Sequence, residues 1–577
     1  MTRFSEALSK EIPGHLERAR EATNQLLKQK KHLTKDITSE ELAKQLDTYQ
    51  EITHHLSAAH IRADAAFSTD QENEEKSKQL KQVIDQATQI SQETIYFTLT
   101  LKDFGETLKE HEQALPQYQT YLRQVREQAK HALKEEQEQL ISTKDKYGSN
   151  AINKIYDMIT GAYTYKIELN GEEHHLTRAE LATHMQSTNR ETRKKARDSF
   201  YEQYGPDKHV LNEMYTALTG DYLEEATMRG YEQPINIRHQ QNDITSDVYE
   251  SLKEATKKHL SLFREYVDLK RRILGYEEMH GYDLRANIKG LPEGLSYEQA
   301  VKQVLNIFAD YAPWLEEHAK TTLRGERVDA HPRKNKRSGA CCYEATPGDE
   351  PLLILNHQED YESLKTLAHE TGHAVHNQLA HKHNALTYQP PIVLAETASN
   401  TAEYLVFKHY LAQADKQQRQ ALLCDFLDDA LASIPRQILY TEYEEWACAH
   451  PDATFSERCE QWKNLQEEQF PALKREEGAD YGWVSIPHIY QLPFYCYGYS
   501  FGLLLSLSLV EQASPEEIKT FLEAGGSEQP EKLLAKSGYD ITNEDFWSEG
   551  FSKLQALVDE LAETLEEKVY EDNQIVS

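Results

Sequence analysis

The longest regular pattern in the chain lies near its N-terminus, where polar residues dominate and apolar residues recur at helical spacing. Residues 15–104 contain neither glycine nor proline and are rich in Glu, Gln, Lys and Leu. Because no a/d heptad is sustained, the pattern favours long packed helices over a coiled-coil scaffold across most of the first 150 residues. One expected amphipathic face carries Leu80, Val83, Ile84, Ala87 and Ile90.

Two short stretches interrupt the helical pattern with β signals. Residues 163–169 alternate between apolar and polar and are followed by Asn-Gly at 170–171, a dipeptide typical of a two-residue hairpin turn. Further on, residues 340–343 and 352–355 are short apolar segments with a Pro-Gly turn between them. We therefore expect a hairpin near 163–176 and a second small sheet just before residue 361.

The segment after this second β signal predicts a helix with one buried side and one chemically active side. His369, Glu370 and His373 form an HExxH pentapeptide. Residues i and i+4 share a helix face, so the two imidazoles can converge on one ion. Glu370 is then placed to act as general base toward a water molecule. The opposite side of the same helix carries Leu364, Leu367, Thr371, Val375 and Leu379.

A second helix, beginning after Pro390-Pro391, supplies carboxylates for the same site. Catalytic zinc usually takes three protein ligands and leaves one position open. Glu396, Asn400 and Glu403 share one face of this helix, and Glu396 is the expected third ligand. Glu403 is either a partner that orients a ligand histidine or an ordinary surface carboxylate. The apolar stripe of this helix consists of Ala395, Ala398, Ala402, Leu405 and Val406.

The sequence around the pentapeptide argues against other classes of metal site. A decoy begins at His111-Glu112, but Leu115 stands where the second histidine would be. A metzincin needs a histidine six residues after His373, and that position is Leu379. A di-metal carboxylate bundle needs a paired second ExxH in the core, and none is evident.

Composition and charge exclude several classes of protein. The chain has 577 residues, with 64 Lys and Arg against 96 Asp and Glu, a net charge of −32. Such a surface repels nucleic acid and anionic membranes. The longest apolar run, residues 501–510, is too short to span a bilayer. With six cysteines in no CxxC pair and no apolar leader at the N-terminus, we expect a cytoplasmic protein with reduced thiols, no nucleic-acid partner and no membrane partner.

Taken together, LAHETGHAVH and VLAETASNTAE resemble the active-site segments of the oligoendopeptidase F branch of the thimet-oligopeptidase family. The likeness extends from about residue 150 onward. One departure is Cys341, which stands where the family has an aromatic residue. Another is the histidine-rich stretch after HETGH. The similar segments include KRSGACCYEA (336–345), RQILYTEYE (436–444) and WVSIPHIYQLPFYCYGYSFG (483–502).

The resemblance implies a mainly α, two-lobed, neurolysin-like fold with a small β-sheet beside the HExxH helix and a deep central cleft. It implies one Zn2+ per chain, bound by His369, His373 and Glu396. A histidine and tyrosines of the 488–499 segment would line the cleft. His488, Tyr495 and Tyr499 fall on one side if this segment is helical, although Pro493 can interrupt it. Tyr497 points elsewhere, and Arg436 receives no role from the sequence.

The resulting expectation is a zinc endopeptidase that hydrolyses short oligopeptides, with Glu370 as base and His488, Tyr495 or Tyr499 stabilising the oxyanion. Residues 1–195 would form an N-terminal helical region and residues 196–577 the catalytic domain. The alternatives are an exopeptidase on the same zinc scaffold and a helical binding protein with a dead site. An aminopeptidase of this class would carry a GxMEN-type motif, and no such string occurs. The oligomeric state is left open.

Overall fold

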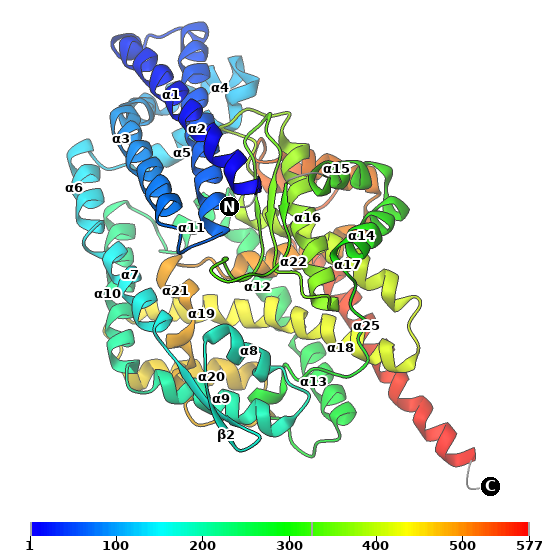
Figure 1. The fold of residues 1–577 in the computed structure, drawn as a ribbon. Helices are drawn as coiled ribbons and strands as arrows, with labels where there is room; N and C mark the ends of the chain where they lie inside the picture. Colours follow the sequence, from blue (N-terminus) through cyan, green and yellow to red (C-terminus); the bar gives the residue numbers. More distant parts are fainter. Residues whose placement is uncertain (1–2, 325–326, 575–577) are drawn as a thin grey trace.

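The computed structural model describes residues 3–324 and 327–574 and is built almost entirely of helices (Figure 1). The first seven helices are α1 (Arg3–Gln29), α2 (Ser39–Ser68), α3 (Glu74–Phe104), α4 (Leu108–Ala114), α5 (Gln119–Ala129), α6 (Glu135–Asp145) and α7 (Ser149–Gly161). The long helices predicted for the N-terminal region are therefore present. The expected stripe on α3 is narrower than predicted, because Val83 and Ile90 are buried whereas Ile84 is 44% exposed.

The N-terminal helices begin where the sequence provides capping side chains. Thr38 accepts a hydrogen bond from the Glu41 backbone N–H, and the Glu41 carboxylate accepts one from the Thr38 backbone in return. Asn73 caps α3 in the simpler way, through the backbone N–H of Lys76. Such caps satisfy amides that a helix start leaves without partners. They fix where the two long helices begin.

The predicted hairpin is present and connects the N-terminal helices to the rest of the chain. Strands β1 (Tyr165–Leu169) and β2 (Glu172–Leu176) pair antiparallel, with Leu169 opposite Glu172. The two turn residues, Asn170 and Gly171, have φ angles of 53° and 85°. Positive φ at both positions defines a type I′ turn, which Asn-Gly favours.

A second group of helices follows the hairpin in the chain and continues to the second sheet. It consists of α8 (Arg178–Met185), α9 (Arg190–Tyr204), α10 (Lys208–Met228), α11 (Asn236–Gln241), α12 (Ser246–Lys258), α13 (Leu260–Leu274), α14 (Tyr297–Tyr311) and α15 (Pro313–Leu323). Helix α9 runs through residue 195, and the division of the chain at that residue stays a prediction.

The second sheet has three strands in the order β3-β5-β4. Strands β4 (Cys341–Tyr343) and β5 (Leu352–Ile354) are the two predicted apolar segments, and they pair antiparallel. The sequence missed β3 (Val328–Asp329), which is only two residues long and pairs parallel to β5. Buried residues of α1 and α2 pack on this sheet, among them Phe4 and Ala65. Because β4 is the last strand in the order, one of its edges has no strand neighbour.

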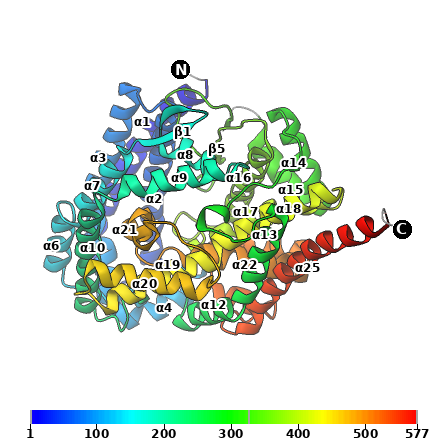
Figure 2. The same ribbon diagram turned by 90° about the horizontal axis from the view of Figure 1, so that it is seen from below.

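The remaining helices carry most of the expected site residues. They are α16 (Tyr361–Ala380), α17 (Ile392–Leu411), α18 (Lys416–Ser433), α19 (Pro435–Ala449), α20 (Phe455–Gln469), α21 (Pro487–Gln491), α22 (Tyr497–Gln512), α23 (Pro515–Ala524), α24 (Pro530–Ala535) and α25 (Glu544–Gln574). Figure 2 shows α25 leaving the body of the molecule toward the C-terminus. Within the described ranges, no helix is both long enough and apolar enough to cross a membrane. The cytoplasmic location stays a prediction.

Close packing of α17 between α16 and α22 depends on two glycines. A Cβ atom on Gly372 of α16 would lie 2.7 Å from the Ala398 carbonyl oxygen on α17. A Cβ atom on Gly502 of α22 would lie 2.7 Å from Cβ of Glu396. Both distances are too short for any other residue without a shift of the helices. The glycines therefore bring the carboxylate helix against the HExxH helix on one side and against α22 on the other.

Candidate metal centre and active site

The HExxH helix has the two sides that the sequence predicted. Asp360 caps its N-terminus through the backbone N–H of Ser363. The predicted apolar side is buried in the largest hydrophobic cluster of the described residues, with Leu367 and Val375 both 0% exposed. His369 and His373 lie on the other side, and their ring centroids are 4.8 Å apart. The two imidazoles are therefore held side by side, and His369 lines a cavity.

Glu396 reaches both imidazoles from the neighbouring helix. The Nε2 atoms of His369 and His373 are 3.1 Å apart. Glu396 Oε2 lies 3.5 Å from Nε2 of His369 and 3.4 Å from Nε2 of His373. Within the described part of the chain, these three residues are the one group of three or more His, Cys, Asp or Glu side chains arranged to hold a metal ion.

The donor set and its spacing fit zinc. Imidazole nitrogen and carboxylate oxygen bind Zn2+ at roughly 2.0–2.2 Å, so two donors of a tetrahedral site lie about 3.3 Å apart. The three separations between the Nε2 atoms and Glu396 Oε2 are all close to this value. Three protein ligands leave the fourth position free for water or substrate. No second cluster accompanies this one in the described ranges, which gives no support to a di-metal centre.

Hydrogen bonds and charge keep Glu396 ionised. Burial raises the pKa of its carboxyl, but the hydrogen bond with His373 and the charges of both histidines outweigh this effect. Ser399, one helical turn further along α17, donates a hydrogen bond of 2.8 Å to Oε2. Together these contacts lower the pKa of Glu396 to about 2. The carboxylate therefore carries the negative charge that a cation requires.

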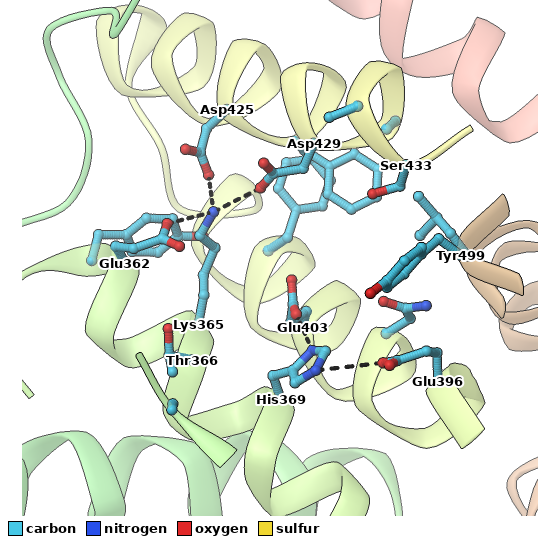
Figure 3. Close-up of a pocket in the computed structure, with 18 of the residues that line it drawn as sticks. Glu362, Lys365, Thr366, His369, Glu396, Glu403, Asp425, Asp429, Ser433 and Tyr499 are labelled. Atoms are coloured by element: carbon cyan, nitrogen blue, oxygen red, sulfur yellow. Dashed lines mark hydrogen bonds and ion pairs between the residues drawn. The ribbon is translucent and has the colours of Figure 1, made fainter. Parts of the chain in front are cut away.

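Glu403 holds His369 at Nδ1, on the side of the ring away from Glu396. It lies two turns beyond Glu396 on α17. Nδ1 of His369 is hydrogen-bonded to Oε1 of Glu403. Burial lowers the pKa of His369, but the adjacent Glu403 carboxylate raises it to about 9. The sequence left two roles open for Glu403, a partner of a ligand histidine or a surface carboxylate. Its contact with His369 favours the first. Figure 3 shows His369 between the two carboxylates of Glu396 and Glu403.

Glu370 lies next to the edge strand of the small sheet. It is 7% exposed, and burial raises its pKa above the ordinary value despite the opposing influence of His369 and His373. The backbone N–H of Cys342 on β4 donates a hydrogen bond to its carboxylate. The edge strand therefore fixes Glu370 beside the two histidines.

The segment with His488 and the tyrosines is not one helix. Helix α21 ends at Gln491 and α22 begins at Tyr497, with a turn at Pro493-Phe494 between them. The shared face depended on one continuous helix, and the chain turns at Pro493 as the sequence allowed. The turn nevertheless brings the three rings together, since His488 stacks on Tyr495 with centroids 5.8 Å apart. Tyr499 shares a hydrogen bond of 3.3 Å with His488 Nε2.

Of the three residues, Tyr499 lines the same cavity as His369 and Glu396 (Figure 3). Its pKa is raised by burial and then by Tyr495. Burial also lowers the pKa of His488. The phenol is therefore a neutral donor and the imidazole is uncharged near neutral pH. Tyr497 points away, as expected, and its hydroxyl accepts a 2.7 Å hydrogen bond from Asn242.

The turn between α21 and α22 is held by two buried side chains that the sequence did not single out. Phe494 has a φ angle of 57°, which is unfavourable for a bulky residue. Its backbone N–H donates a 2.8 Å hydrogen bond to the Glu444 carboxyl. Arg238 Nε donates a 3.0 Å hydrogen bond to the Pro493 carbonyl. Burial raises the pKa of Glu444 well above its usual value and so favours the protonated form of its carboxyl.

The cavity has a volume of about 440 Å³ and extends from the metal centre to the last turn of α18. Lys365, one turn before His369, forms ion pairs of 2.8 Å with Asp425 and 3.0 Å with Asp429 (Figure 3). Asp429 also pairs with Arg285 at 3.1 Å. This charged cluster ties the N-terminal half of the HExxH helix to α18.

Two of the residues missed by the sequence analysis carry recognisable spacing. Ser399 is three residues after Glu396, and Lys365 is four residues before His369, so each shares a helix face with a ligand. Glu344, just after β4, gave no local signal. Burial raises its pKa, and its charge interacts with those of His373 and Glu396.

A helical fold with an HExxH helix, a carboxylate helix and a small sheet beside them defines a metallopeptidase. The family model for peptidase family M3 matches residues 183–553, and the model for oligopeptidase F matches residues 91–165. The chain belongs to peptidase family M3, in its oligopeptidase F branch.

Individual proteins of known name or structure agree with this assignment. The chain is 28% identical to oligopeptidase PepF of Bacillus subtilis (strain 168) over 473 residues, which cover 78% of this chain and 69% of that protein. A peptidase structure from Chlamydophila abortus matches with a TM-score of 0.81 and 25% identity, covering 91% of each chain. Oligoendopeptidase F from Enterococcus faecium has the same fold, with a TM-score of 0.71 and 19% identity over 97% of this chain and 99% of that one. The predicted fold class is confirmed.

Proposed function

We propose that this metallopeptidase is a zinc-dependent endopeptidase that cleaves short peptides. The observation that carries the proposal is the convergence of His369 Nε2, His373 Nε2 and Glu396 Oε2 at separations of 3.1–3.5 Å. The sequence likeness to proteins named oligopeptidase and oligoendopeptidase F supports short peptides as substrates.

When bound by these three residues, one zinc ion polarises the scissile carbonyl and lowers the pKa of a water molecule. Glu370 is placed to accept a proton from the attacking water on its carboxylate and to deliver it to the leaving amine nitrogen. Its raised pKa suits both transfers, because a carboxylate with a pKa nearer the working pH is a stronger base toward water and can still return the proton.

Tyr499 supplies a donor for the oxygen that becomes negative during hydrolysis. Its hydroxyl lines the cavity, while His488 and Tyr495 pack around its ring. A preorganised donor of this kind lowers the barrier by about 2.7–4 kcal/mol in comparable oxyanion sites. We assign the donor role to Tyr499, with His488 and Tyr495 holding the phenol in place.

The outer edge of β4, beyond the Cys342 N–H that donates to Glu370, offers a binding surface for the peptide main chain. Strand β4 lies at the end of the sheet, next to Glu370. An extended peptide can add to such an edge through backbone hydrogen bonds, with little dependence on its side chains. This mode of binding suits an enzyme that accepts many peptide sequences.

Digestion of a mixed peptide library, with the products sequenced by mass spectrometry, tests the proposal. The parent protein is expected to cut internal bonds of short peptides, and the Glu370→Gln variant to retain zinc while losing nearly all turnover. Release of only terminal residues would identify an exopeptidase. Cleavage by the variant at the parent rate would show that Glu370 is not the base.

A further inference from the structure

Three histidines outside the active site gather where helix α1 packs against helix α2. His15 lies on α1, and His54 and His55 lie on α2. The ring centroids of His15 and His55 are 5.3 Å apart, and those of His54 and His55 are 4.8 Å apart. Because His15 and His55 are 40 residues apart in the chain, no local spacing in the sequence indicates this cluster. The packing of the two helices creates it.

Small residues bring the two helices close enough for these rings to meet. Ala19 and Ala59 follow His15 and His55 by four residues, and both alanines are fully buried. Since residues i and i+4 share a helix face, the two histidines belong to the same helix contact. All three histidines of the cluster are only half-buried. Solvent and small ions therefore have access to the rings.

Two ring nitrogens of the cluster lie at the separation of metal ligands. Nδ1 of His15 and Nδ1 of His55 are 3.2 Å apart. Two donors of a tetrahedral zinc site lie about 3.3 Å apart. In the metal centre described above, the Nε2 atoms of His369 and His373 are 3.1 Å apart. The lone pairs of the two Nδ1 atoms can therefore share one proton, as a hydrogen bond, or one metal ion.

The imidazoles of this cluster are neutral near pH 7. Burial lowers the pKa of His15, His54 and His55, that of His55 to about 4. A ligand histidine has to be neutral, and a histidine that is protonated at the working pH must first release its proton. Unlike His369, whose pKa is about 9, His15 and His55 do not carry this extra proton.

The charges around the cluster allow a cation to bind. Arg62 interacts with the charge of His15, but it is paired with Glu11 at 2.7 Å and with Asp349 at 3.2 Å. Two carboxylates therefore offset this guanidinium. Glu51 and Arg18 add one charge of each sign. The three acids outnumber the two arginines, so the surroundings do not repel a metal ion.

We propose that His15 and His55 bind a divalent transition-metal ion that prefers imidazole ligands, such as zinc, through their Nδ1 atoms, with water in the remaining positions. With two protein donors in place of three, this site binds zinc more weakly than the active-site centre and loses its ion during purification. The bound ion links α1 to α2. The link lies beside the ion pair of Arg62 with Asp349, which connects α2 to the turn between β4 and β5.

Titration with zinc tests this site once the active-site centre has been removed. In the double variant His369→Ala, Glu396→Ala, only one of the three active-site ligands remains, and this background is expected to bind one zinc per chain. Addition of His15→Gln or His55→Gln should raise the dissociation constant at least about tenfold, because a single imidazole is left at the site. His60→Gln, at an exposed histidine of α2, is the matched control and should leave the constant unchanged.

Thermal unfolding of the same four proteins, with zinc or with EDTA, provides a second measurement. An ion bound to the folded state raises the unfolding temperature. Zinc should therefore raise it in the background and in the His60→Gln protein, but not where His15 or His55 is replaced. Because each protein is compared with itself, a general loss of stability cancels.

Three results would overturn the proposal. The first is a background protein that binds no zinc. The second is a zinc affinity that stays unchanged in His15→Gln or in His55→Gln. The third is an equal loss of affinity in His60→Gln, which would mean that zinc binds at scattered histidines of the surface. None of these results bears on the proposed peptidase function, because the activity depends on other residues.

Discussion

Glu403 Oε1 is hydrogen-bonded to Nδ1 of His369, on the side of the ring opposite to the ligand nitrogen Nε2. The carboxylate fixes the ring so that Nε2 faces His373 and Glu396. Since a metal ligand must be a neutral imidazole, zinc has to displace the proton that Glu403 favours on His369. Orientation and proton release are therefore coupled in one contact.

Removal of this contact should weaken metal binding. Partners of ligand histidines typically contribute 10–100-fold to metal affinity, so Glu403→Ala should raise the zinc dissociation constant by about that factor. Competition with a chromogenic chelator measures the constant. Glu445→Ala, at a carboxylate on α19 outside the metal centre, is the control and should leave it unchanged. Unchanged zinc affinity in Glu403→Ala would mean that the hydrogen bond does not hold the ligand.

Substitution of Gly372 tests the close approach of the two metal-binding helices. Gly372→Ala places a methyl group 2.7 Å from backbone atoms of α17. Overpacking of this kind costs about 1–3 kcal/mol, and the helices must separate, which should also reduce zinc affinity. Gly220→Ala in α10 is the control, because a Cβ there meets nothing within 4 Å. The Gly220→Ala substitution should stabilise the protein by about 0.5–1 kcal/mol, because alanine is favoured over glycine inside a helix. Thermal unfolding with and without zinc measures both effects.

Glu444 should act on catalysis through the turn that carries Tyr495. In Glu444→Leu the N–H of Phe494 loses its acceptor, and the tyrosines shift. Because small misplacements of catalytic groups are costly, kcat should fall about ten- to hundredfold with little change in KM. Glu444→Gln keeps an amide oxygen that accepts from the Phe494 N–H, so its kcat should stay near that of the parent protein. An equal loss in both variants, measured by steady-state kinetics on one peptide, would contradict a positioning role.

The same residue predicts a dependence of stability on pH. Burial raises the pKa of Glu444 well above its usual value in the folded protein, so over a range of pH the native state holds a proton that the unfolded chain releases. Between those two pKa values the free energy of unfolding decreases as pH rises, by about 1.36 kcal/mol per pH unit for a single group. Glu444→Gln should remove this contribution. The measurement is the slope of unfolding temperature against pH for the parent protein and the variant. Identical slopes would refute the predicted contribution of Glu444.

Sequence reasoning located the parts of the site that depend on local periodicity. His369 and His373 share a face because they are four residues apart, and Glu396 follows from the polar face of the next helix. Features that form where distant segments of the chain meet could not be predicted. The tyrosine cluster forms through a turn fixed by Glu444 and Arg238, which are far from it in the chain. Strand β3 is two residues long and is set by its pairing with β5 rather than by any local pattern.

The most direct test of the account is the zinc content of three purified proteins measured by mass spectrometry together with their peptide turnover. The parent protein should contain one zinc per chain and be active. Glu370→Gln should contain one zinc and be inactive. Glu396→Ala should lose both zinc and activity. If Glu396→Ala retained one zinc per chain and the parent rate, the proposed metal centre would be contradicted.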